Sequence, residues 1–126
     1  MHEDTKLGHF GKALRSQEKT LSLWLSDCQV VQFLHTRGPI AIALSYQVLK
    51  SGTSAGANYE EADSGSSDRD TLAKRKIVLR ELKETLFRLR VLRETGFLLP
   101  AQDPVIEETS ELTSIVAALI RNTDVN

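Results

Sequence analysis

Residues 68–94, DRDTLAKRKIVLRELKETLFRLRVLRE, decide the fold of this chain. Apolar residues recur in this stretch at helical spacing, so they predict the inward stripe of an amphipathic helix about 27 residues and some 40 Å long. The stripe consists of Leu72, Leu79, Leu82, Leu86 and Leu89, widened by Ile77, Val78, Val91 and Leu92. Ser67 is the expected N-cap, followed by acidic residues in the first turn, and Thr95-Gly96 the expected stop near residue 95.

Two helices are predicted before this one. The first should cover about residues 16–36, where spacings of three and four select the stripe Leu21, Trp24, Cys28, Val31 and His35. The second should run from about residue 39 to 62, because Pro39 suits a first helical position. Its stripe is Leu44, Val48, Ser51, Ala55, Asn58 and Ala62.

A last helix is predicted over about residues 104–122, with Asp103 as N-cap and Pro104 as its first residue. Its stripe is Leu112, Ile115, Val116, Leu119 and Ile120. No segment alternates with the period of two that strands require. The predicted fold is therefore all-α, an up-down-up-down antiparallel four-helix bundle over residues 16–122, with a flexible N-terminal arm at 1–15 and a tail at 123–126.

Composition narrows the class of protein. With 126 residues, 40% of them hydrophobic and 26% charged, the chain is expected to form one globular domain. It contains no apolar run of the roughly 18 residues that a membrane span requires, and Met1 to Arg15 lack the apolar stretch of a signal peptide, so a cytoplasmic protein is expected. The single cysteine, Cys28, excludes an internal disulfide and a thiolate metal site.

The motifs that could carry catalysis are weak. Residues 52–56, GTSAG, match the G-x-S-x-G pattern of hydrolases, but that serine needs a turn after a strand and a histidine later in the chain. Here Ser54 lies in a predicted helix, and the histidines, His2, His9 and His35, all precede it. These histidines also lack metal-ligand spacing. The prediction is a protein that is not an enzyme, with no metal, cofactor or small-molecule substrate.

Small and polar residues distinguish the two central helices. Gly52 and Gly56 each cost about 1 kcal/mol relative to alanine inside a helix. They therefore predict the close approach of a neighbouring backbone, and a break at Gly52 is the alternative. Close to the inward stripes lie Asn58, Glu61, Glu81 and Glu84, which are predicted to form a polar network that fixes helix register or subunit packing.

The formal net charge of -1 is unevenly distributed. Residues 68–94 hold nine of the sixteen basic residues and five acidic ones, a net charge of +4 against −5 for the remainder. One basic stripe repeats every seven residues and has Arg80 beside it; it comprises Arg69, Lys76, Lys83 and Arg90. Such a stripe can follow a phosphate backbone, but ordinary i to i+4 ion pairs on a solvated face are the favoured interpretation.

Three segments carry the motifs of a known family: Lys50 to Ala62 (KSGTSAGANYEEA), Lys76 to Thr85 (KIVLRELKET) and Arg90 to Gly96 (RVLRETG). Together they resemble the four helix bundle protein family, also called the 23S rRNA-intervening-sequence proteins, and the similarity covers roughly Leu21 to Arg121. The resemblance implies a four-helix protomer, and several members assemble as homopentamers. Some are encoded within insertions in bacterial 23S rRNA genes, and their molecular activity is poorly defined.

The resemblance also assigns signature positions. Those matching the family are Lys50, Ser51, Asn58, Glu61, Glu81 and Glu84, and with Gly52, Ala55 and Gly56 they are expected to serve packing and assembly. Lys50 stands where the family usually has arginine. A related branch, the accessory variability proteins of diversity-generating retroelements, consists of basic pentamers that bind nucleic acid and a reverse transcriptase; this chain departs from it in its near-neutral charge. The first hypothesis is a homo-oligomeric, pentameric scaffold or interaction protein, and the second an RNA- or DNA-binding accessory protein.

Overall fold

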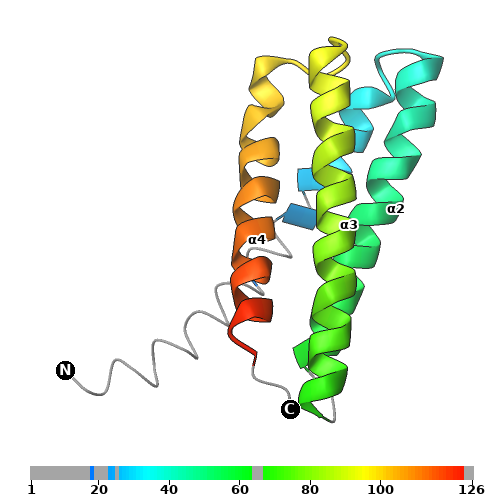
Figure 1. Cartoon of the computed structure of the whole chain (residues 1–126). Coiled ribbons are helices and arrows are strands. Elements are labelled where there is room, and N and C mark those ends of the chain that lie inside the picture. Colours follow the sequence, from blue (N-terminus) through cyan, green and yellow to red (C-terminus); the bar gives the residue numbers. More distant parts are fainter. Residues whose placement is uncertain (1–17, 19–22, 25, 64–66, 124–126) are drawn as a thin grey trace.

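The computed structural model describes residues 18, 23–24, 26–63 and 67–123, and all its regular elements there are helices. They are α2 (Pro39–Asp63), α3 (Asp68–Glu94), the short 3-10 helix η1 (Pro100–Gln102) and α4 (Asp103–Arg121). A first helix precedes them, with helical conformation over residues 26–34 and at 18, 23 and 24. In Figure 1, α3 stands between α2 and α4, the first helix lies behind α3, and successive helices run in opposite directions. The all-α up-down-up-down bundle is confirmed, while the predicted arm at 1–15 lies outside the described residues.

The ends of α3 follow from local chemistry. Ser67 has extended backbone, and its Oγ accepts a hydrogen bond from the Asp70 backbone N–H at 3.2 Å, as an N-cap does. At the other end Gly96 has a φ of 84°, a conformation that side chains disfavour, and the Leu98 N–H bonds back to the Leu92 carbonyl at 3.0 Å. The two predicted signals therefore mark the beginning and the end of α3.

Helix α2 is continuous through Gly52, so the alternative of a break there is wrong. It begins at Pro39, directly after Gly38, which has a φ of 103°. Because α2 carries serine, alanine and glycine on its inner side, α3 packs against it over much of its length. Its buried residues are Ala41, Ser45, Val48, Ser51, Gly52, Ala55, Tyr59 and Ala62. Leu44 and Asn58, expected on this stripe, are only half-buried at its edge.

Helix α4 begins one residue earlier than expected. Asp103 is its first residue instead of its N-cap, and the N-cap position falls on Gln102, whose side chain makes no capping bond there. The Asp103 carboxylate instead accepts a hydrogen bond from Arg93 Nε at 2.8 Å, across the connection between α3 and α4. An ion pair with a neighbouring helix has thus replaced the local cap that the sequence pattern suggested.

The first helix presents a different face to the core than predicted. Its buried residues are Leu23, Asp27, Val30 and Leu34. Trp24 and His35, expected inside, are exposed, and Cys28 and Val31 are only half-buried; Leu21 lies outside the described residues. The helix carries apolar side chains on two adjacent stripes, and the predicted stripe lacks the aspartate that lies on the other one. The structure buries the aspartate.

Leucine and valine side chains from the first helix, α2, α3 and α4 form one core. Leu34, Val48, Leu82, Leu89 and Leu98 are among the fully buried ones, and Leu98 comes from the connection between α3 and α4. The close packing of these branched side chains holds the described helices together. No helix in the described part of the chain has an apolar stretch sufficient to cross a bilayer.

Candidate functional site

One of the signature positions, Ser51, joins α2 to α3 inside the bundle. Thr85 Oγ1 donates to Ser51 Oγ at 2.6 Å, and both side chains are buried. Ser51 Oγ in turn donates to the Gln47 carbonyl at 3.0 Å, so the cross-helix contact ends on a backbone acceptor. Because the paired hydroxyls are buried away from water, they fix how far α2 can slide along α3. Ser51 therefore serves helix register within one chain.

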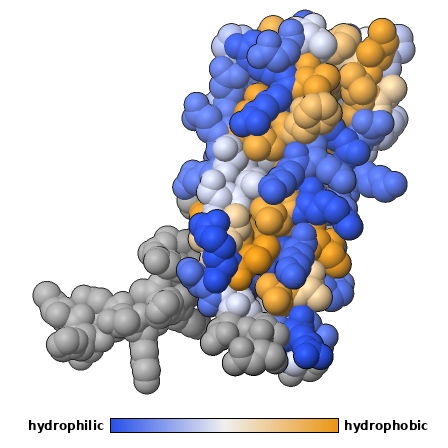
Figure 2. Space-filling view, in the orientation of Figure 1, coloured by the Kyte–Doolittle hydropathy of each residue, from blue (hydrophilic) through white to orange (hydrophobic). Residues whose placement is uncertain are grey.

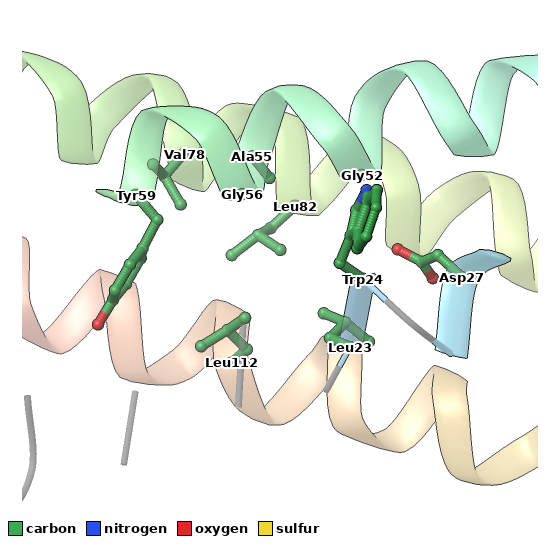
Figure 3. Close-up of a pocket in the computed structure, with 10 residues that line it drawn as sticks. All are labelled: Leu23, Trp24, Asp27, Gly52, Ala55, Gly56, Tyr59, Val78, Leu82 and Leu112. Carbon is green, nitrogen blue, oxygen red and sulfur yellow. The ribbon is translucent and has the colours of Figure 1, made fainter. Parts of the chain in front are cut away.

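Gly52 faces a side chain that the sequence analysis did not select. A Cβ added at Gly52 would lie 2.6 Å from Asp27 Oδ2, closer than nonbonded atoms tolerate. The close approach predicted at Gly52 is thus real, but the neighbour is a carboxylate of the first helix instead of a backbone. Figure 3 shows Asp27 and Trp24 of the first helix next to Gly52, with Leu23, Leu82 and Leu112 among the other residues that line the same pocket.

Asp27 is a buried acid without full hydrogen bonding. Its side chain is only 2% exposed, and its Oδ1 has no hydrogen-bond partner. Burial, with a smaller contribution from the negative charge of Glu108 on α4, raises the pKa of Asp27 from 3.8 to about 7. The adjoining cavity, of about 10 Å³, has the room of about one water molecule. A single acidic residue within the apolar run of the first helix was the sequence signal for this site.

The other signature positions are distributed between core and surface. Ala55 is buried and Gly56 half-buried, both along the cavity beside Asp27. Asn58 Nδ2 donates to the Ser54 carbonyl at 2.9 Å, within α2. On the surface, Glu61 forms an ion pair with Lys74 at 2.7 Å, which links the C-terminal part of α2 to the N-terminal part of α3.

The acidic signature positions of α3 do not form a buried network. Glu81 is half-buried and lies 3.6 Å from Arg80, and exposed Glu84 lies 3.9 Å from Arg88. Lys50 is exposed on α2. Ser51 therefore lies at the contact between α2 and α3, and Gly52 at the contact between α2 and the first helix. The charged signature positions lie outside these two buried contacts.

The residues that could have carried chemistry are not assembled. Ser54 lies within continuous α2, and its Oγ is 3.4 Å from Asn58 Nδ2. His35 is exposed and packs its ring edge-on against Tyr46 with 5.7 Å between ring centroids. Among the described residues no cluster of His, Cys, Asp and Glu could hold a metal ion. His2 and His9 lie outside the described residues.

An apolar groove opens between α2 and α3 on the outside of the bundle. It has a volume of about 180 Å³ and is lined by Leu44, Gln47, Phe87, Arg88, Val91 and Leu92. Phe87 is 66% exposed and Val91 37% exposed, large fractions for side chains of this kind. Arg88 Nη1 donates a hydrogen bond to the Gln47 carbonyl at 3.1 Å, so a charged guanidinium lines the groove between the two helices. Figure 2 shows apolar side chains among the charged ones along this side of the molecule, in its upper part and lower down.

The basic stripe lies on the surface of α3, as its spacing indicates. All of its members are exposed: Arg69, Lys76, Arg80, Lys83 and Arg90. Phe87 stands within this stripe, four residues after Lys83 and three before Arg90, so helical geometry places it between the two cations. Phe87 is not among the predicted site residues, although an aromatic residue outside the leucine stripe of α3 is a signal that the sequence contains.

Fold and site together define an all-helical bundle with a buried acid in its core and a basic, partly apolar outer face. Compared with known proteins, the chain is similar to a crystal structure of a protein of unknown function from the S23 ribosomal protein family of Bacteroides thetaiotaomicron VPI-5482. The identity is 27%, the TM-score is 0.77, and the match covers 85% of this chain and 99% of the other. This is the family of 23S rRNA-intervening-sequence proteins, so the resemblance seen in the sequence motifs is confirmed. No protein-family model and no curated protein matches the chain.

Proposed function

We propose that this chain is a non-enzymatic, homo-oligomeric, pentameric helical bundle protein of the 23S rRNA-intervening-sequence type, which acts as a scaffold or interaction module in the cytoplasm. The observation that carries the proposal is the apolar groove between α2 and α3 with exposed Phe87 and Val91. Contiguous apolar surface on a small domain is typical of an interface with another protein. Burial of a phenylalanine side chain contributes about 1.5–3 kcal/mol, which is enough to anchor such an interface.

The scaffold proposal is tested by the mass in solution. Light scattering at micromolar concentration should give a multiple of the 14.0 kDa protomer, with five copies expected. Phe87→Glu should shift the mass toward the protomer, because a carboxylate then occupies the groove. Leu99→Ser is the matched control, since Leu99 is 41% exposed but does not line the groove. A wild-type protein that stays at the protomer mass would overturn the proposal.

A second candidate function is an RNA- or DNA-binding accessory protein that uses the basic stripe on α3. The observation in its favour is that all of the stripe's cations are exposed along one side of a single straight helix. Repetition of this helix around an oligomer would add avidity. Fluorescence anisotropy with labelled single-stranded RNA and duplex DNA should then show binding that weakens steeply as salt rises. Absence of binding at low salt would eliminate this function.

A further inference from the structure

Basic side chains flank the groove on both of its helices. Lys83 and Arg90, both exposed, flank Phe87 by one helical turn on either side. Lys50 is likewise exposed on α2, one turn along from the groove residue Gln47. If two copies met groove to groove, these cations would lie close to the same cations of the other copy, and the repulsion between like charges is unfavourable. Exposed Glu84 lies 3.9 Å from the groove residue Arg88, so the net positive charge of the rim comes from Lys83, Arg90 and Lys50, and it favours a partner surface of negative charge.

This chain carries such a surface on α4. The helix contains four acidic residues against the single basic Arg121, and Glu107, Glu108 and Glu111 are exposed. The buried residues of α4, which include Val105, Leu112 and Val116, point the opposite way from Glu107 on the helix. The acidic surface consequently faces outward from the bundle, on a different helix from the groove.

The two surfaces lie at the same height along the bundle. The contact of Arg93 Nε with Asp103 Oδ1 at 2.8 Å marks one level on antiparallel α3 and α4. At 1.5 Å per residue, Arg90 and Lys83 lie about 4.5 and 15 Å below that level. On α4, Glu107 and Glu111 lie about 6 and 12 Å below it by the same rise. Subunits set side by side with parallel axes would thus meet without a shift along the axis.

From these observations we infer that the α2–α3 groove with its basic rim docks onto the acidic face of α4 of a second copy of this chain. The contact is heterologous, groove against α4, so each copy uses both surfaces, and equal height lets a series of such contacts close into a ring. Phe87 supplies apolar burial, and the paired charges fix register and exclude the groove-to-groove arrangement. The inference rests on the proposed homo-oligomer and names the surfaces that build it.

Charge reversal on each surface separately tests the contact. Lys83→Glu with Arg90→Glu, and Glu107→Lys with Glu111→Lys, should each raise the dissociation constant of the assembly at least about tenfold, measured by sedimentation. The chain with all four changes should reassemble, because the reversed rim again faces a reversed α4. Circular dichroism checks that each variant keeps its helix content.

The control is a reversal elsewhere on the same stripe. Arg69 and Lys76 lie about 26–36 Å below the marked level, far from the groove. The double variant Arg69→Glu with Lys76→Glu should therefore have the same mass in solution as the wild-type assembly. If the wild type assembles but either reversed surface has no effect, or the fourfold variant stays dissociated, the docking inference is wrong and the proposed oligomer stands. A wild type that remains a protomer overturns both.

Discussion

Asp27 is the residue whose chemistry is most at odds with its surroundings. An aspartate that is 2% exposed loses its hydration, and its Oδ1 regains no hydrogen bond in exchange. The protonated form is therefore favoured in the folded chain, and the negative charge of Glu108 adds to the effect. Around neutral pH this carboxyl is divided between two states that differ in charge inside the core.

A pH dependence of stability follows from this shift. The pKa of Asp27 is about 7 in the folded chain against 3.8 for an ordinary aspartate, so the folded state holds the proton more tightly. The free energy of unfolding should therefore fall as pH rises from about 4 to about 7, by roughly 4 kcal/mol in total. Asp27→Asn should remove this slope and stabilise the protein at pH 8, as measured by urea unfolding at several pH values. Equal slopes in wild type and variant would contradict the assignment.

Gly52 offers a second residue-scale prediction, in which the usual effect of alanine is reversed. Alanine in a helix interior normally stabilises by about 1 kcal/mol relative to glycine. Here its Cβ would meet Asp27 Oδ2 at 2.6 Å, so Gly52→Ala should destabilise the bundle. With Asp27→Ala already present, the same substitution should become neutral or stabilising. A double-mutant cycle by denaturant unfolding measures the coupling, and additive effects would exclude the contact.

At the scale of elements, the hydroxyl pair of Ser51 and Thr85 holds α2 against α3. Thr85→Val keeps the shape of the side chain but leaves the buried Ser51 hydroxyl without its donor, so a loss of about 1–3 kcal/mol is expected in thermal unfolding. Adding Ser51→Ala should recover part of that loss, because neither hydroxyl then remains unpaired. A Thr85→Val variant as stable as wild type would show that the pair contributes nothing to register.

The helices themselves could be predicted from the sequence because their signals are local. Ser67 and Gly96 act through their own backbone and nearest turns, so they mark the ends of α3 without knowledge of the fold. The core face of the first helix could not be read in this way. Two apolar stripes compete there, and what decides between them is the room that Gly52 on α2 leaves for the Asp27 carboxylate.

The same limit applies to the surfaces. The stripe of cations on α3 is a property of one helix and could be read from spacing, whereas the groove needs Leu44 of α2 beside Phe87 of α3. Asp103 shows the converse, since its local capping pattern gave way to Arg93 on a neighbouring helix. A groove or an ion pair between two helices could not be predicted from the sequence, because it depends on how the helices pack against each other.

At the scale of the whole molecule, folding and assembly should be linked. A protein stabilised by contact with its own copies becomes harder to unfold as concentration rises, because mass action favours the associated folded state. The melting temperature of the wild type should therefore increase between about 1 and 100 μM, while that of Phe87→Glu should not change with concentration. Calorimetry at several concentrations measures this, with Leu99→Ser expected to behave as wild type. A wild-type melting temperature independent of concentration would show that the exposed groove plays no part in holding the folded chains together.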